Sequence, residues 1–212
     1  MIVSLDPENI HHRRAAALLH GRLLPDSPIA GLGRGFMENF YYDKLIRDGL
    51  ISCDLYFHEG DYVAFAAYTR EPFTFLSRGK KGHFFFLCFL LAGSILARPS
   101  RARIILNTLR FEKRRSSPSV LASAKARRMG ELLSFAVNPA YSGFRDPGTG
   151  KKVPNLLFDR VIDHFRKVDY QTLQFIVRKD NHASLLFFNS YGAEIRKADY
   201  VGSDVFLLNL SL

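Results

Sequence analysis

The stretch that decides the fold of this chain is Gly130-Glu131-Leu132-Leu133-Ser134-Phe135-Ala136-Val137-Asn138-Pro139, followed by Gly148-Thr149-Gly150-Lys151-Lys152-Val153-Pro154-Asn155-Leu156-Leu157. Its first part predicts an apolar strand, and its second part predicts a glycine-containing loop that leads into a helix. Further on, Asn181-His182-Ala183-Ser184-Leu185-Leu186-Phe187-Phe188-Asn189-Ser190-Tyr191-Gly192-Ala193 predicts a short helix headed by an asparagine. With a strand between the two helices, this order suits a protein that binds pyrophosphate with backbone amides.

Length and composition predict a single domain over residues 1–212. Of the 212 residues, 47% are hydrophobic, which is enough for a packed core. The formal charge of +10 predicts an anionic partner, and nucleic acid, anionic lipid and a polyphosphate cofactor all qualify. Cys53 and Cys88 both lie in apolar surroundings and are expected to be buried, reduced thiols, which predicts a cytoplasmic protein.

The N-terminal part predicts a strand, two helices and a β-hairpin. The strand covers 2–5, and the first helix is expected to begin at an Asp6 N-cap and to end near Leu23. A second helix is expected over 29–47, and the alternation in 50–68 predicts the hairpin. The buried face of the second helix is expected to contain Gly35, Phe36, Phe40, Tyr41 and Leu45.

The C-terminal part predicts a helix over 153–167, a strand over 171–177, a helix over 181–191 and closing strands over 194–200 and 204–210. Strands and helices therefore mix along the whole chain. The predicted fold class is α/β of the mixed (α+β) kind.

Residues 72–128 interrupt this order and are predicted to be a helical, basic insertion between the third and fourth strands. Helices are expected over about 83–97 and 101–111, before a loop rich in Ser, Pro and Arg. The segment holds thirteen Arg and Lys residues and one acidic residue, Glu112. Such a run is usually a solvated face, and the phosphates of a coenzyme or a nucleotide-linked sugar are its nearest anionic ligands. No nucleic-acid partner is expected, because no DNA- or RNA-binding motif accompanies the run.

The apolar run from Phe84 to Ala97 is too short to span a bilayer and leaves three interpretations open. It packs in the core or in a homodimer interface, or it forms a lid over the molecule that accepts a transferred group. As a third interpretation, region 84–103 contacts an anionic membrane as an interfacial helix flanked by Arg98, Arg101 and Arg103, which would make the protein membrane-associated.

The loop before the helix at Val153 is a candidate phosphate site. A helix N-terminus carries unpaired amides and a partial positive charge, so it attracts anions. Gly148 and Gly150 allow close approach of the backbone, and Lys151 and Lys152 add full charges. By itself, Gly-Thr-Gly is a weak signal and is more typical of an ordinary strand-to-helix turn than of a phosphate site.

In context, these stretches resemble the GCN5-related N-acetyltransferase (GNAT) superfamily. That family has a strand ending in an apolar-x-Val pattern and then Arg/Gln-Gly-x-Gly-x-Gly/Ala leading into a helix. Thr149 falls at the Arg/Gln position, Gly150 at the first glycine, and Lys152 and Pro154 at the other two. One of the three glycines is kept, and an extra stretch, 144–148, follows Gly143.

The second stretch matches the family pattern Asn-x-x-Ala-x-x-Phe-Tyr-x-x-x-Gly-Phe more closely. Here the matching positions hold Asn181, Ser184, Phe187, Phe188, Gly192 and Ala193. The resemblance implies that Asn181 contacts the pantetheine arm of coenzyme A. The family tyrosine that protonates the departing thiolate is replaced by Phe188, which has no ionisable proton. Tyr191 and Tyr141 are therefore candidate general acids, and an unassisted thiolate is the alternative.

The resemblance implies a GNAT-type central sheet, mixed and mostly antiparallel, flanked by helices. It also implies an N-acyltransferase that moves an acetyl group from acetyl-CoA to a primary amine, for example on an amino sugar, by direct attack in a ternary complex. Pantetheine would pair with the strand ending at Val137, where that strand splays from the strand over 171–177. The implied cofactor-binding residues are Phe135, Ala136, Val137, Gly143, Thr149, Gly150, Lys151, Lys152, Val153, Asn181 and Phe188.

Glu131 is the candidate general base, because several family members carry a catalytic glutamate at the start of this strand. A solvent-facing glutamate at a strand end is an equally weighted interpretation. No metal site is expected, since no histidine has metal-ligand spacing with a second His or Cys. The alternative function is a non-catalytic or membrane-surface binding module that retains the GNAT fold.

Overall fold

The computed structural model describes residues 1–115, 128–196 and 204–212. The strands of this part are β1 Ile2–Ser4, β2 Ser52–His58, β3 Asp61–Thr69, β4 Met129–Val137, β5 Thr172–Arg178, β6 Glu194–Arg196 and β7 Val205–Ser211. The helices are α1 Ile10–Leu23, α2 Pro28–Gly31, α3 Arg34–Phe36, η1 Met37–Tyr41, α4 Lys44–Arg47, α5 Phe75–Gly82, α6 Phe84–Ala97, α7 Arg101–Arg115, η2 Pro139–Tyr141, α9 Val153–Lys167 and α10 His182–Ser190.

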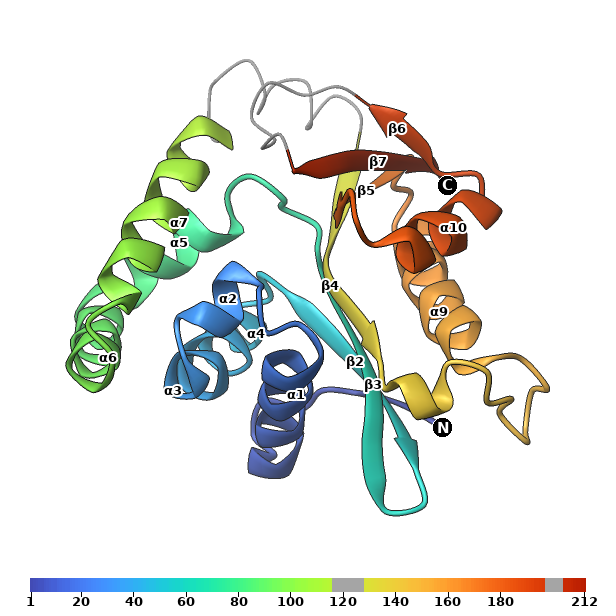
Figure 1. The fold of residues 1–212 in the computed structure, drawn as a ribbon, viewed down its shortest axis with the longest axis horizontal. Coiled ribbons are helices and arrows are strands. Elements are labelled where there is room, and N and C mark those ends of the chain that lie inside the picture. The colour runs from blue at the N-terminus through green and yellow to red at the C-terminus, as the bar shows by residue number, and fades with distance from the viewer. Residues whose placement is uncertain (116–127, 197–203) are drawn as a thin grey trace.

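The strands form one sheet in the order β1-β2-β3-β4-β5-β7-β6. Within the described residues, β4 and β5 are the parallel pair, and the other neighbours run antiparallel. Helices α1 to α4 cover one face of the sheet, and α9 covers the other (Figure 1). The predicted mixed, mostly antiparallel sheet flanked by helices is confirmed.

Two hydrophobic cores follow from this layering. The first, here called the helical core, lies between the sheet and α1 to α4, and contains Phe40, Leu45 and Phe65. The second, the α9 core, lies on the opposite face and contains Phe158 and Phe165. Side chains of β3 and β4 alternate between the two cores, as the two-residue period of a strand requires.

The first predicted helix begins later than expected. Asn9 is its N-cap and accepts a 2.9 Å hydrogen bond from the amide of His11. The Asp6 carboxylate instead accepts from the amide of Glu8. The prediction of an Asp6 N-cap is therefore wrong, because Asp6 stabilises the turn that precedes the helix.

The second predicted helix, over 29–47, is broken into short pieces. Gly33 has φ = 99°, a left-handed conformation that ends α2, and the turn over η1 is a π-helix. Four of the five residues expected on its buried face, Phe36, Phe40, Tyr41 and Leu45, are buried. Gly35 is exposed, so that part of the prediction is wrong.

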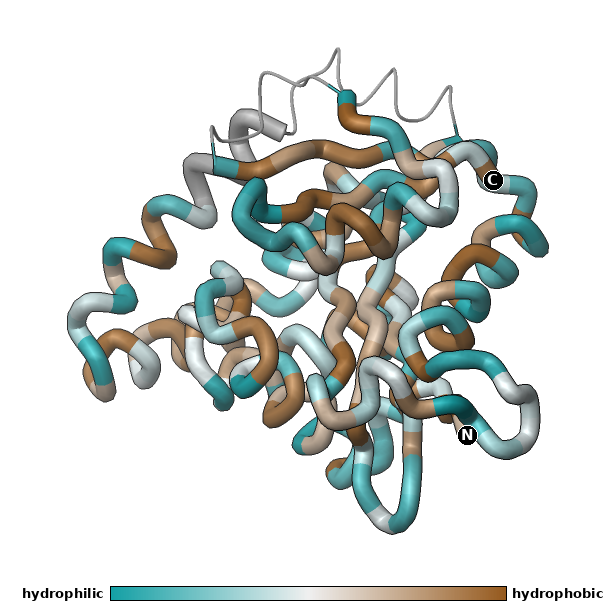
Figure 2. The backbone as a smooth tube through the Cα atoms, turned by 45° about the vertical axis from the view of Figure 1, so that its right-hand side comes forward, coloured by the Kyte–Doolittle hydropathy of each residue, from teal (hydrophilic) through white to brown (hydrophobic). Residues whose placement is uncertain are grey.

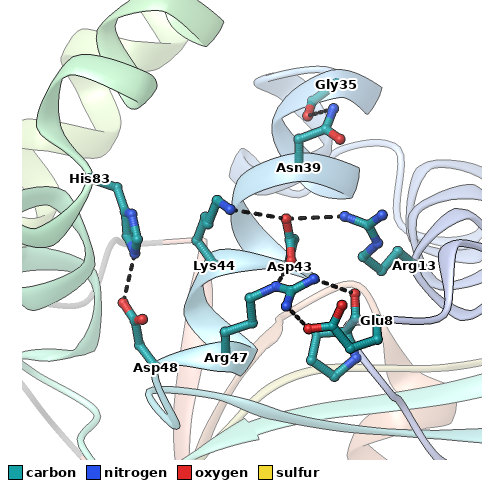
Figure 3. Close-up of polar contacts among 10 residues, drawn as sticks. Glu8, Arg13, Gly35, Asn39, Asp43, Lys44, Arg47, Asp48 and His83 are labelled. Carbon is teal, nitrogen blue, oxygen red and sulfur yellow. Dashed lines mark hydrogen bonds and ion pairs between the residues drawn. The ribbon is translucent and has the colours of Figure 1, made fainter.

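An ion-pair cluster holds these pieces against α1. Asp43 contacts Arg13 at 3.1 Å, Lys44 at 3.5 Å and the Arg47 guanidinium, which also contacts Glu8 (Figure 3). Because Asp43 is buried, its charge requires these partners. The cluster therefore fixes α4 beside the start of α1.

The segment predicted as an insertion contains α5, α6 and α7 before it leaves the described residues. Helix α5 was not expected, since Gly79 and Gly82 lower its helix propensity. A Cβ at position 79 would overlap the Leu45 side chain, so this glycine permits close packing of α5 on α4. The predicted loop rich in Ser, Pro and Arg and the end of the predicted strand at 197–200 lie outside the described residues.

Candidate active site

The parallel strands β4 and β5 separate at the centre of the sheet. Their pairing extends from Met129–Thr172 to Leu132–Phe175 and goes no further. Beyond it, β4 follows β3 as far as Val137, while β5 follows β7 as far as Arg178. This splay, which the resemblance implied, leaves the β5-facing edge of Leu133 to Val137 without a strand partner among the described residues.

A cavity of about 930 Å³ opens at the splay. Its walls come from the loop over 23–29, the start of α5, β4, β5 and the start of α10. Most lining side chains are apolar, and ten of the 27 are polar, among them Glu131, Ser134 and Asn181. A mainly apolar pocket with convergent polar groups is typical of a small-molecule site.

A β-bulge in β4 determines which face Glu131 occupies. Ala67 pairs with Ser134 and Tyr68 pairs with Leu132, so Leu133 is an extra residue in β4. Gly130 and Leu132 consequently face the α9 core, where a Cβ at position 130 would overlap the Phe165 ring. Glu131 points to the opposite face, beneath the helical core.

Glu131 is 3% exposed and lines the cavity. The interpretation of a solvent-facing strand-end glutamate is therefore wrong. Nearby, burial raises the pKa of the Tyr41 phenol far above its usual value, and the charges of Cys53 and Glu131 raise it further. Tyr41 also lines the cavity and stays protonated at neutral pH, so it can donate a hydrogen bond there.

Glu131 belongs to a polar row that crosses four strands. Thr69, Glu131, Gln174 and Asn209 are aligned in register on β3, β4, β5 and β7. Gln174 is 1% exposed, and its Nε2 finds no hydrogen-bond partner among the described residues. This row was not expected from the sequence, although a glutamine between Leu173 and Phe175 in an apolar strand was a visible signal.

A second polar network reaches the cavity from α1. His20 Nε2 lies 2.8 Å from Ser27 Oγ, and His20 Nδ1 lies 2.8 Å from the Tyr42 hydroxyl. Burial lowers the pKa of His20 to about 4, so the imidazole is neutral at pH 7. Ser27 lines the cavity and also caps α2 by accepting from the Ala30 amide at 3.1 Å.

The candidate phosphate loop is organised around Asp146. Its carboxylate accepts hydrogen bonds from the amides of Gly148 and Thr149, at 3.1 and 3.0 Å, and its carbonyl accepts from Gly150. The Tyr56 hydroxyl donates to the same carboxylate at 2.6 Å, and this bond holds the pKa of Asp146 below its usual range. The predicted amide donors at Thr149 and Gly150 are thus satisfied within the loop.

The other residues predicted to bind phosphate in this loop differ in whether they already have partners within the protein. Lys151 pairs with Asp159 at 2.6 Å, whereas the exposed Lys152 makes no ion pair within the described part of the chain. Val153 is buried and its amide donates to the Phe144 carbonyl at 3.0 Å. Gly143 has open space around its Cα.

The two tyrosines proposed as general acids lie away from Glu131. The Tyr191 hydroxyl donates to Asp159 at 2.9 Å, on α9. Tyr141 packs against His58 and Phe144 beyond the far end of β4, and six strand residues from Glu131 to Val137 span about 20 Å. The structure does not bring these three side chains together, and neither tyrosine lines the cavity.

The residues of the second matched stretch lie at the cavity wall. Asn181 caps α10 by accepting from the Ser184 amide at 3.1 Å, and it lines the cavity. Phe188 is 4% exposed and packs against Phe175 with ring centroids 4.2 Å apart. Phe135 lines the cavity as well, while Ala136 is buried in the helical core.

No protein-family model and no curated protein matches this chain. Solved structures do match along its whole length. A GNAT-family acetyltransferase from Staphylococcus aureus Mu50 aligns with 100% of this chain and 98% of its own, at 10% identity and a TM-score of 0.56. The ribosomal-protein-alanine N-acetyltransferase of Brucella melitensis aligns with 100% of this chain and 99% of its own, at 15% identity and a TM-score of 0.55.

The PaiA N-acetyltransferase from Thermoplasma acidophilum, solved in complex with coenzyme A, also matches. It aligns with 100% of this chain and 99% of its own, at 12% identity and a TM-score of 0.52. At such identities the likeness concerns the fold. The chain therefore has the fold of the GCN5-related N-acetyltransferases.

Proposed function

We propose that this protein is an acyl-CoA-dependent N-acyltransferase, with acetyl-CoA as the donor and a small-molecule primary amine as the acceptor. The observation that carries the proposal is the splay of β4 and β5, which opens directly into a cavity with a buried glutamate. The unpaired edge of β4 offers backbone groups to an extended amide-containing arm, as a strand partner would.

Several residues of the described chain fit the coenzyme. Asn181 uses its side-chain oxygen in the α10 cap, and its NH₂ group, which makes no hydrogen bond to any other described residue, can donate to the arm. Lys152, at the N-terminus of α9, supplies a positive charge for phosphate. When bound, acetyl-CoA supplies the electrophilic thioester carbonyl and the thiolate leaving group.

Glu131 is the base in this proposal. An amine arrives as an ammonium ion and needs a free lone pair to attack, so its proton passes to the Glu131 carboxylate. Tyr41 and Ser134 lie beside Glu131 and provide hydroxyl groups that orient the amine or the carbonyl oxygen. Phe188 contributes no proton, so thiolate leaves without a tyrosine at that position.

The lining favours an amine on an apolar body. An amino sugar carries hydroxyl groups on every side, and each one left unpaired in an apolar pocket costs free energy. The cavity walls are mainly leucine, isoleucine, valine, proline and phenylalanine. An acceptor screen would therefore begin with arylalkyl amines and use nucleotide-linked amino sugars as the comparison.

Isothermal titration with acetyl-CoA and free coenzyme A tests the proposal. Micromolar binding of both is expected. Lys152→Glu is expected to weaken binding about tenfold, whereas the matched Lys151→Glu should have a smaller effect because Asp159 already neutralises that charge. Equal effects of the two variants would contradict the assignment of Lys152 to the phosphates.

A non-catalytic module is the second candidate, and the Asp146 contacts favour it. The carboxylate occupies loop amides that a pyrophosphate would otherwise use. If neither acetyl-CoA nor coenzyme A produces heat of binding at millimolar concentration, this second function replaces the first.

A further inference from the structure

Helix α6 is apolar around its whole circumference. Its sequence from Phe84 to Ala97 contains no charged residue, and Figure 2 shows it in the hydrophobic colour along most of its length. A soluble helix normally keeps one polar face toward water, and a helix that is hydrophobic all round is normally covered on all sides.

One stripe of α6 packs on the protein. Leu87 is buried, and Leu90 and Leu91 contact the helical core, with the next turn held by a 2.6 Å hydrogen bond from Ser94 to the Leu32 carbonyl. These residues follow the i, i+3, i+4, i+7 spacing of a single helix face. The inner face of α6 is therefore already occupied.

The outer stripe is exposed. Phe85 is 87% exposed, Phe89 is 77% exposed and Leu96 is 84% exposed. They follow the spacing of the opposite face, and Phe84 lies beside them at 58%. Large apolar side chains grouped in this way mark an interaction site, whereas isolated ones need no explanation.

The helix is held in this orientation at both ends. His83 Nε2 lies 2.8 Å from Asp48, which joins the start of α6 to the end of α4 (Figure 3). At the other end, the Arg101 guanidinium donates to the carbonyl and hydroxyl oxygens of Ser94. Because these contacts fix the rotation of α6, the outer stripe cannot turn inward without breaking them.

Exposed basic residues flank α6 on both sides in the sequence. Lys81 precedes α6, Arg98 and Arg103 follow it, and all three are exposed. From Gly79 to Phe111 the sequence contains no Asp or Glu. An apolar face with cationic ends fits a surface that is apolar at depth and anionic at its boundary.

We propose that α6 docks this protein on an anionic lipid membrane, with Phe85, Phe89 and Leu96 in the acyl boundary and Lys81, Arg98 and Arg103 at the headgroups. No single helix of the described residues is long and apolar enough to cross a membrane. Helices α5 and α6 reach that length and hydropathy only as a pair, and the pair is bent by 98°. Phe75 and Gly79 of α5 are buried in the protein, so α6 lies along the membrane surface.

A second copy of the chain fits the stripe less well. In a two-fold dimer through α6, the same patch meets itself, so the basic ends of one helix face basic residues of the other. Like charges brought together at an interface oppose association, whereas an anionic membrane attracts them. The acid-free stretch from Gly79 to Phe111 supplies no compensating carboxylate.

Flotation of the purified full chain with vesicles tests the proposal. The vesicles contain phosphatidylcholine alone or with about 30 mol% phosphatidylglycerol, an anionic fraction that is high enough to attract basic segments. The protein is expected to float with the anionic vesicles and to remain below with the neutral ones. Phe85→Ser with Phe89→Ser should reduce partitioning about tenfold or more, and Lys81→Glu with Arg98→Glu should abolish the preference for anionic lipid.

The matched control is Leu18→Ser with Leu186→Ser, which removes two exposed leucines from α1 and α10. It should float like the unchanged chain. A fluorophore on the exposed Cys88 should shift to the blue on anionic vesicles, while the buried Cys53 stays unlabelled.

Two results would overturn the proposal. One is a chain that does not float on anionic vesicles at low salt. The other is a lipid-free dimer, seen by sedimentation, that Phe85→Ser with Phe89→Ser converts to monomer, because the occupant of the stripe would then be a second copy. Coenzyme titration of the same preparations is independent of both results, so the proposed transferase function stands or falls separately.

Discussion

Glu131 of β4 lies directly opposite Gln174 of β5, at the last pair but one before the two strands separate. A carboxylate in this place can receive a proton at the mouth of the splay, and an amide cannot. Glu131→Gln is therefore expected to lower kcat by about 10²–10⁴-fold and to leave coenzyme affinity within about twofold. Steady-state kinetics and titration of the same variant check both parts. Activity at the unchanged level would remove Glu131 from the role of base.

Gln174 carries a buried amide whose Nε2 has no partner in the described chain, and such a group lowers stability. Gln174→Met keeps the length of the side chain and removes the unsatisfied donor. We expect the free energy of unfolding to stay equal or to rise by about 1 kcal/mol, while KM for the amine increases. Urea unfolding and kinetics on one preparation measure both. A loss of stability without any change in KM would assign Gln174 a purely structural role.

His20 predicts how stability depends on pH. Its pKa is about 4 in the folded chain and about 6.5 when unburied, so between these values the unfolded chain binds more protons. Stability should therefore be fully present above pH 6.5 and fall by up to about 3 kcal/mol as the pH drops to 4. Unfolding curves across this range should show a flatter profile for His20→Gln. Part of the slope will remain, because burial lowers the pKa of His164 as well. An unchanged slope in the variant would show that His20 is not the titrating group.

Tyr191 is expected to act in stability rather than in proton transfer. Burial and the hydrogen bond to Asp159 raise the pKa of its phenol to about 12, and the hydroxyl also accepts from Asn155 at 3.1 Å. Tyr191→Phe should cost about 1 kcal/mol of unfolding free energy and leave the turnover rate within about threefold of the unchanged chain. Denaturation and steady-state kinetics measure the two effects. A turnover rate that drops by about two orders of magnitude at unchanged stability would restore Tyr191 as the general acid.

Gly130 permits α9 to lie on the sheet. Because a Cβ there would overlap the Phe165 ring, Gly130→Ala should destabilise the protein by about 1–3 kcal/mol through overpacking. Gly143→Ala is the control, since no atom of the described residues lies within 4 Å of its added Cβ. Chemical denaturation compares the two. Equal stability of both variants would mean that α9 can shift away from β4 at little cost.

The parts of the fold with strong local signals were predictable from the sequence. Helix α9 has the predicted bounds, Val153–Lys167, because Pro154 fits its first turn and its apolar residues keep a helical spacing. The hairpin of β2 and β3 was confirmed because its alternation and the turn at Glu59-Gly60 agree. The prediction that Cys88 is buried is wrong. Cys88 lies in the apolar run of α6, and only one stripe of that helix packs on the protein.

The rest depends on contacts between distant residues. The break after α2 depends on the left-handed φ of Gly33, and the sequence does not distinguish this glycine from Gly35. The capture of loop amides by Asp146 depends on Tyr56, ninety positions earlier in the chain. The polar row that contains Glu131 depends on register across four strands, and register is set by the whole sheet.

Because of the bulge at Leu133, the face that Glu131 occupies depends on the number of residues between Glu131 and Val137. Counted back from Val137 in steps of two, Glu131 would share the face of Phe135 and point into the α9 core, and the extra residue reverses that outcome. Loss of the Leu133 codon would restore strict alternation and leave the residues on either side facing as they do now. Loss of a neighbouring codon outside the bulge would instead turn part of the strand over. For anyone who grafts this strand into another protein, the number of residues after Glu131 therefore matters as much as their identity.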